Sequence, residues 1–323
     1  MSKVIIGIHG LGNKPPQKLL KKWWKKSIRE GLTIIGQPRM FLKFELVYWA
    51  DILYPTALSP RVKDKKSPAY LNDPYSPAQN LVPKKTNKFK QMALDYLRDQ
   101  LDRIFLNDDL SLNFSFLTDL IIHQYFRDLE IYFSTKCLDQ TRLPCLARDL
   151  IRERLVRCLE KYRRHEILLI AHSMGSIIAY DVLRFTPHVK ADILVTIGSP
   201  LGLPVVISKI VSEQHSSLTK ENVVQIPENV LKAWYNFSDL DDKVAFDYRL
   251  AGDFKPNVRG VQVTDQIVYN NYEINGHRNP HKSYGYLRSP EVAKAIHDFL
   301  LPPKRYWWQK IPALWKKFFR SRT

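Results

Sequence analysis

The sequence predicts an α/β fold, built on a mainly parallel sheet of about six strands with helices on both faces. Short apolar runs recur along the chain, and some, such as 167–170, are continuous enough to be buried on both faces of a sheet. Segments with apolar residues at helical spacing separate these runs. Strands that alternate with helices favour parallel pairing. A length of 323 residues, with 45% hydrophobic and 25% charged residues, is typical of a folded chain with a large core.

The first elements are two predicted strands and a helix. The range 4–8 is an apolar run that ends in H-G-L-G (9–12), where the glycines permit a sharp turn and leave N–H groups free. The range 18–34 is predicted to be a helix, because its apolar residues share one side and its basic residues lie opposite. The range 44–49 is the second predicted strand.

A long insertion, 54–145, separates the second strand from the third. Its first part, to about residue 90, is rich in Pro, Asn, Ser and Lys, a composition typical of loops. Helical patterns follow at 89–106 and 117–133. In an enzyme such an insertion would cover the active site as a helical cap. The alternative is that it only decorates the scaffold.

Beyond the insertion the strands and helices alternate again. In order, we expect a helix over 146–162, strands over 167–170, 191–197, 230–237 and 260–272, and a helix that begins at Pro290 with Ser289 as its N-cap. In open parallel sheets, active sites lie at the carboxyl ends of the strands. Polar residues at these ends are therefore the candidates for function.

The most informative stretch is A-H-S-M-G at 171–175, between the buried run 167–170 and a helical pattern. A serine at a strand-to-helix turn is held in a strained bend that exposes its hydroxyl, and the pattern for this turn is G-x-S-x-G. Ala171 occupies the first position here, so the match is partial. Capping of the helix is the alternative role for Ser173.

Carboxylates and imidazoles follow two later strands. Asp239, Asp241 and Asp242 come after the strand 230–237, whereas His277 and His281 come after the last one. A serine hydroxyl becomes a good nucleophile when an imidazole takes its proton, and the imidazole needs a carboxylate to fix its tautomer. The order serine, aspartate, histidine is the order found on α/β-hydrolase sheets.

These segments give the chain a resemblance to the α/β-hydrolases, specifically to their lipase/esterase-like branch. The matching pieces are I-H-G-L-G, I-A-H-S-M-G-S, T-I-G-S-P-L-G, D-D-K-V-A and N-P-H-K-S-Y-G-Y-L. The stretch A-H-S-M-G is similar to the alanine-variant elbow of small bacterial lipases. The resemblance extends from residue 1 to about 300, apart from the insertion. It implies an α/β-hydrolase fold with a minimal sheet of six strands.

The resemblance also implies catalytic roles. Ser173 would be the nucleophile and His281 the base, with His277 as the rival base. The oxyanion hole would be formed by the backbone N–H groups of Leu11 and Met174. Such a triad requires neither a cofactor nor a metal ion.

The identity of the acid stays open at this point. Related loops place the aspartate before Pro-Val-Ala, which favours Asp242 ahead of Lys-Val-Ala. The commoner spacing from the end of the strand favours Asp241 instead, and Asp239 is the third candidate. We take Asp242 as the expected acid.

Charge and composition bear on partners and location. The net charge of +18 favours an anionic partner, and seven basic residues without an acidic one occur in both 14–29 and 302–323. We expect a hydrolase domain over 1–301 and a basic, aromatic, amphipathic tail over 302–323. Such a tail suits an anionic membrane surface, and its alternative role is packing on the body. No nucleic-acid-binding motif occurs, so we expect no nucleic acid partner.

The expected function is that of a serine esterase or lipase that acts on carboxylic esters of lipids through an acyl-enzyme. Thioesterase or amidase activity and a non-catalytic membrane-associated adaptor are the alternatives. No apolar stretch is long enough to span a membrane, and three cysteines without metal spacing suit a reducing compartment. We therefore expect a cytoplasmic protein in peripheral contact with a membrane.

Overall fold

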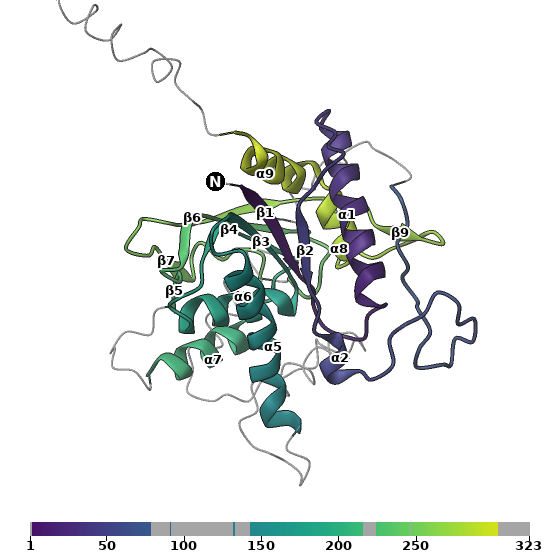
Figure 1. The fold of residues 1–323 in the computed structure, drawn as a ribbon, viewed down its shortest axis with the longest axis horizontal. Coiled ribbons are helices and arrows are strands. Elements are labelled where there is room, and N and C mark those ends of the chain that lie inside the picture. The colour runs from purple at the N-terminus through teal and green to yellow at the C-terminus, as the bar shows by residue number, and fades with distance from the viewer. Residues whose placement is uncertain are drawn as a thin grey trace, which may run out of the picture.

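The centre of the molecule is a six-stranded sheet in the order β2-β1-β3-β4-β6-β8 (Figure 1). The computed structural model describes residues 2–78, 91, 132, 143–215, 224–245 and 247–302. Its central strands are β1 (Lys3–Ile8), β2 (Phe44–Val47), β3 (Glu166–His172), β4 (Ala191–Ile197), β6 (Val230–Ser238) and β8 (Val263–Ile267). All five neighbouring pairs are parallel. The predicted α/β fold with a mainly parallel sheet is thus confirmed.

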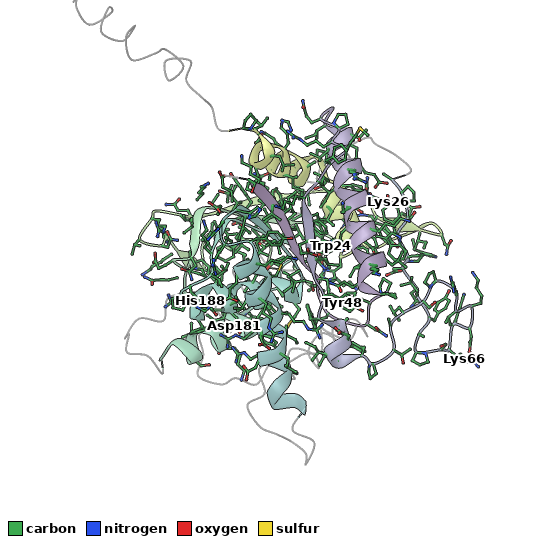
Figure 2. All side chains as sticks on the ribbon, in the orientation of Figure 1. Trp24, Lys26, Tyr48, Lys66, Asp181 and His188 are labelled. Atoms are coloured by element: carbon green, nitrogen blue, oxygen red, sulfur yellow. The ribbon has the colours of Figure 1, made fainter. Side chains whose placement is uncertain are left out.

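Helices cover both faces of the sheet. One face carries α1 (Gln17–Ile34), α8 (Ser283–Arg288) and α9 (Pro290–Leu300), and the other carries α5 (Leu143–Lys161), α6 (Met174–Phe185) and α7 (Pro204–His215). Strand β3 shows why both layers are needed, because Leu169 contributes to one core and Leu168 to the other. Figure 2 labels Trp24 on the α1 side and Asp181 on the α6 side.

Several elements, most of them short, were not expected from the sequence. They are α2 (Ala50–Leu53), α7, α8 and the two-stranded pairs β5 (Val224–Gln225) with β7 (Phe254–Lys255) and β9 (Glu273–Ile274) with β10 (His277–Arg278). The strand predicted over 260–272 is shorter in the structure. It is confined to β8, since Gly260 lies in a turn at φ 74° and the sheet pairing of β8 with β6 covers only 263–267.

The N-cap expected for the last helix is correct in position but not in bonding. Helix α9 begins at Pro290 after Ser289, as predicted. The Ser289 hydroxyl donates to the Tyr286 carbonyl at 2.9 Å and makes no capping bond to the helix. It therefore stabilises the junction of α8 with α9.

Only part of the insertion 54–145 is described. Residues 54–78 form an irregular segment beside α1, and the ring of Tyr132 is buried against the α6 layer, where its hydroxyl donates to Asp181 at 2.6 Å. The helices expected at 89–106 and 117–133 lie outside the described residues, apart from Gln91 and Tyr132. The tail 302–323 also lies outside them, apart from Pro302. No helix within the described ranges is long and apolar enough to cross a membrane.

Candidate active site

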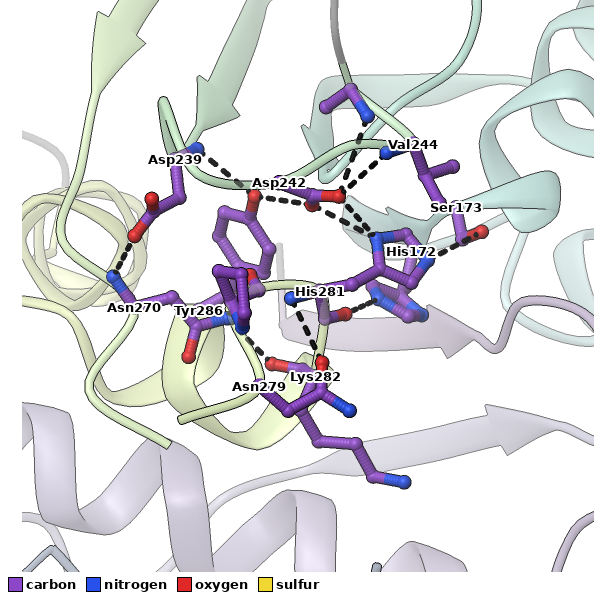
Figure 3. A network of polar contacts seen from close by, with 12 residues as sticks. His172, Ser173, Asp239, Asp242, Val244, Asn270, Asn279, His281, Lys282 and Tyr286 are labelled. Carbon is purple, nitrogen blue, oxygen red and sulfur yellow. Dashed lines mark hydrogen bonds and ion pairs between the residues drawn. The ribbon is translucent and has the colours of Figure 1, made fainter. Parts of the chain in front are cut away.

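Ser173 occupies the turn between β3 and α6, with φ 54° and ψ −130°. A side chain rarely adopts this backbone conformation, so the surrounding structure must hold it there. The Ser173 N–H donates to the Ile197 carbonyl on β4 at 3.1 Å. The hydroxyl makes no capping bond to α6 and lies 3.0 Å from Nε2 of His281 (Figure 3). The Ser173 hydroxyl therefore does not cap helix α6.

Two glycines permit this turn because neighbouring backbones approach closely. A Cβ atom added to Gly10 would lie 2.5 Å from the Cβ of Ser173, and one added to Gly175 would lie 2.7 Å from the Ile8 carbonyl oxygen. Both contacts are shorter than real Cβ atoms show. The small residues on each side of Ser173 therefore have a steric cause.

His281 lies between β10 and α8 and connects Ser173 to a carboxylate. Its Nδ1 atom lies 2.9 Å and 2.8 Å from the two carboxylate oxygens of Asp242. A protonated Nδ1 that donates to this carboxylate leaves Nε2 as the acceptor for the serine hydroxyl. The backbone around His281 is also held, since its N–H donates to Asn279 Oδ1 at 3.1 Å and its carbonyl accepts from His172 Nε2 at 2.8 Å.

The Asp242 side chain is completely buried and fully hydrogen-bonded. Besides His281, it accepts from the Tyr286 hydroxyl at 2.7 Å and from the backbone N–H groups of Val244 at 3.0 Å and Ala245 at 3.4 Å. Burial of a carboxylate is costly unless such donors replace its water shell, and here four groups contact the Asp242 oxygens.

The other two carboxylates of the cluster bond elsewhere. Asp239 accepts from the Asn270 N–H at 2.6 Å and pairs with Arg278, while Asp241 is exposed and pairs with the same guanidinium at 2.6 Å. Burial raises the pKa of Asp239, although Arg278 and the Asn270 N–H act in the opposite direction. Both carboxylates thus hold the loop that carries Asp242.

The rival histidine lies away from this arrangement. His277 is exposed on β10 and pairs with Ile274 of β9, in a two-stranded pair apart from the central sheet. The two short strands are joined by Asn275 and Gly276, at φ 52° and 75°. Asn-Gly between two strands is a hairpin signal, and it could have revealed this turn in the sequence.

The two backbone N–H groups expected to form an oxyanion hole belong to segments that meet at Ser173. Met174 is the first residue of α6, and Leu11 lies in the glycine turn after β1. His9 braces that turn: its Nδ1 atom lies 2.8 Å from the Gly10 carbonyl, and its Nε2 accepts from the Trp49 N–H at 3.0 Å. Burial lowers the pKa of His9 to about 3, so the imidazole is neutral.

A cavity of about 710 Å³ opens beside Ser173 and His281. Its apolar lining comes from the glycine turn, α1 and residues 54–73, with Leu11, Leu20, Trp24, Leu58, Leu71 and Tyr284 among the contributors. Lys282 also lines it and pairs with Asp73 at 3.3 Å. The described part of the insertion therefore forms a wall of this cavity.

The sequence reading missed three residues that hold the site together: Tyr286, His172 and Asp73. Tyr286 lies within N-P-H-K-S-Y-G-Y-L, but no spacing rule links it to the carboxylate that it contacts. His172 lies within A-H-S-M-G, but its bond to the His281 carbonyl depends on the path of a distant loop. Asp73 pairs with Lys282, 209 positions later in the chain. Such contacts are set by tertiary structure and leave no local pattern.

Comparison with protein-family models found no match, and comparison with curated proteins found none either. Within the described ranges, no cluster of three His, Cys, Asp or Glu side chains is placed to hold a metal ion. The arrangement around Ser173 therefore has to be interpreted from its own geometry.

Proposed function

We propose that the protein is a serine hydrolase of the α/β-hydrolase fold that cleaves carboxylic esters. The observation that carries this proposal is the continuous chain from Ser173 Oγ to His281 Nε2, at 3.0 Å, and from His281 Nδ1 to the Asp242 carboxylate, at 2.8 Å. The nucleophile follows β3, the acid follows β6 and the base follows β8, which is the order expected on such a sheet.

In the proposed mechanism the Ser173 oxygen attacks the ester carbonyl carbon while His281 takes the hydroxyl proton. The N–H groups of Leu11 and Met174 donate to the developing oxyanion, and Asp242 stabilises the imidazolium. Collapse of the tetrahedral intermediate breaks the bond to the alcohol oxygen, which receives the proton from His281. Water then repeats the sequence on the acyl-enzyme and releases the acid.

The cavity favours the proposal that the protein binds its substrate by an apolar acyl group. Its volume of about 710 Å³ lies in the range of small-molecule sites, and its lining combines apolar side chains with a few polar groups near Ser173. Esters of lipids fit this description. Thioesters and amides use the same catalytic apparatus, so a series of matched ester, thioester and amide substrates distinguishes these activities.

Labelling with a fluorophosphonate probe tests the proposal directly. The wild-type protein should react at Ser173, and Ser173→Ala should remove the label. Ser173→Ala and His281→Ala should each lower kcat on p-nitrophenyl esters by roughly 10⁴-fold, because triad members act as a unit. The matched control is His277→Ala, which removes an exposed imidazole and should leave kcat unchanged.

An adaptor without catalytic activity is the competing function. It predicts no labelling at Ser173 and no turnover on esters of any chain length. If His277→Ala abolishes turnover and His281→Ala does not, the base has been assigned to the wrong histidine.

A further inference from the structure

A compact loop, residues 59–70, projects from the body beside the cavity; we name it the basic loop. Its ends are joined, because Ser59 and Tyr70 form a parallel bridge and the Ser59 N–H donates to the Ala69 carbonyl at 2.8 Å. Internal bonds shape the tip, among them Ser67 N–H to the Asp64 carbonyl at 3.1 Å. Figure 1 shows this segment extending outward from the side of α1 and α2.

The tip of the basic loop has a concentrated positive charge. Arg61, Lys63, Lys65 and Lys66 are all exposed, and Figure 2 shows Lys66 at the outer edge of the molecule. The carboxylate of Asp64, the one acidic residue of the loop, accepts the Lys66 N–H at 2.9 Å and so shapes the turn. Across the described residues, none of the four basic side chains forms an ion pair. Like charges held so close together favour binding of an anionic partner.

The base of the same loop belongs to the cavity. Pro68 and Tyr70 line it, together with Leu58 and Leu71 just outside the loop, and so do Ser173 and His281. The residues with the positive charge and part of the cavity wall thus belong to the same short loop. A nucleic acid would use the charge but not the apolar lining, whereas an anionic lipid surface provides both phosphates and acyl chains.

We propose that the basic loop binds an anionic lipid surface and so places the opening of the Ser173 cavity at the membrane. The binding itself depends only on the loop, but delivery of lipid esters to Ser173 rests on the function proposed above. Lys65 and Lys66 do not line the cavity, so their contribution is to attach the protein rather than to bind the substrate.

The test uses the full chain and vesicles of phosphatidylcholine with phosphatidylserine, measured by co-sedimentation. Lys65→Gln/Lys66→Gln should weaken binding by at least about 10-fold, since each basic residue near such a surface contributes roughly 5-fold. The matched control is Arg163→Gln/Arg164→Gln, which removes two exposed adjacent charges that precede β3, at the other end of the strand from Ser173. This control should change binding by less than about 2-fold. Both variants keep residues 303–323, so any contribution of the tail is the same in each.

Three results would overturn the proposal. The first is an equal loss of vesicle binding in the two variants, and the second is vesicle binding by Lys65→Gln/Lys66→Gln that equals that of the wild type. The third is wild-type binding to a DNA duplex that is tighter than its binding to the vesicles. Far-UV circular dichroism shows that each variant is folded, and this readout does not depend on the proposed catalytic function. Failure of the proposed catalytic function is recognised separately, because it removes fluorophosphonate labelling at Ser173 and leaves vesicle binding unchanged.

Discussion

At the residue scale, the direction in which each carboxylate points favours Asp242 as the acid of the proposed triad. Asp242 is buried against His281, while Asp241 is exposed and bonded to Arg278. Asp242→Asn should lower kcat by about 10⁴-fold, since an amide no longer fixes the productive tautomer. Asp241→Asn is the matched control and should change kcat by less than about 3-fold. Steady-state kinetics on a p-nitrophenyl ester measures both, and the reverse order would assign the role to Asp241.

Tyr286 is the second residue whose role can be tested. Its hydroxyl donates to Asp242 at 2.7 Å and accepts from the Asp239 N–H at 2.9 Å, and burial beside Asp242 raises its pKa, so it remains a donor. Tyr286→Phe leaves Asp242 with one donor fewer, and a less stabilised carboxylate stabilises the imidazolium more. The pH midpoint of kcat/KM should therefore rise, with KM nearly unchanged.

A purely structural role for Tyr286 would give a different pattern. Tyr286→Phe would then lower the free energy of unfolding without moving the midpoint of the pH profile. Tyr284→Phe is a suitable control, because Tyr284 lies on the same helix and in the cavity wall but is not bonded to Asp242.

At this scale the sequence singles out one serine, Ser173, but leaves a choice among neighbouring carboxylates, of which it favoured Asp242. Serine at a strand-to-helix turn has a local pattern, because the strained bend requires small neighbours at fixed positions. Asp241 and Asp242 differ by a single position, and the choice between them depends on the path of the loop. That path is set by Arg278 and Tyr286, which are distant in the chain.

At the scale of elements, the long apolar strands were predictable because burial on both faces requires continuous apolar residues. Strand β3 is buried from Ile167 to His172, as its sequence indicates. Helix α8 and strands β9 and β10 are too short to show a period. Their positions depend on contacts such as that of the buried Arg288 with the Asn271 side chain at 2.6 Å.

The close approach of α6 to β1 allows a prediction at this scale. Alanine in place of glycine ordinarily stabilises a helix by about 0.5–1 kcal/mol. Gly175→Ala should instead destabilise the protein by about 1–3 kcal/mol, because its Cβ would lie 2.7 Å from the Ile8 carbonyl oxygen and 2.9 Å from that of His9. Urea unfolding measures this effect. A stabilised variant would show that the two backbones can separate without cost.

At the scale of the whole molecule, two buried imidazoles connect segments of the candidate active site. His9 links the turn after β1 to Trp49, and His172 links the end of β3 to the loop of His281. Burial lowers the pKa of both, to about 3 for His9. The folded protein therefore holds them neutral, whereas in the unfolded chain they accept protons at ordinary pH values.

This difference makes stability depend on pH. The unfolded chain protonates His9 below a pKa of 6.5, and the folded protein does so only below about 3. Between these values the unfolded state binds more protons, so the free energy of unfolding rises with pH. The stabilising contribution is complete above pH 6.5 and is lost as the pH falls toward 3. From pH 7 to pH 5 the loss is about 2 kcal/mol for one such histidine.

Urea unfolding of the wild type and of His9→Gln at pH 7 and pH 5 tests this linkage. Glutamine has no proton to gain in this range, so the variant should lose about 2 kcal/mol less than the wild type between the two pH values. His188→Gln is the control, because His188 is an exposed imidazole and its removal should preserve most of the wild-type loss (Figure 2). The comparison cancels the carboxylates common to all three proteins. Equal losses of unfolding free energy in the wild type and His9→Gln would mean that the folded state accommodates protonated His9. The interpretation that a neutral His9 imidazole holds the glycine turn would then be wrong.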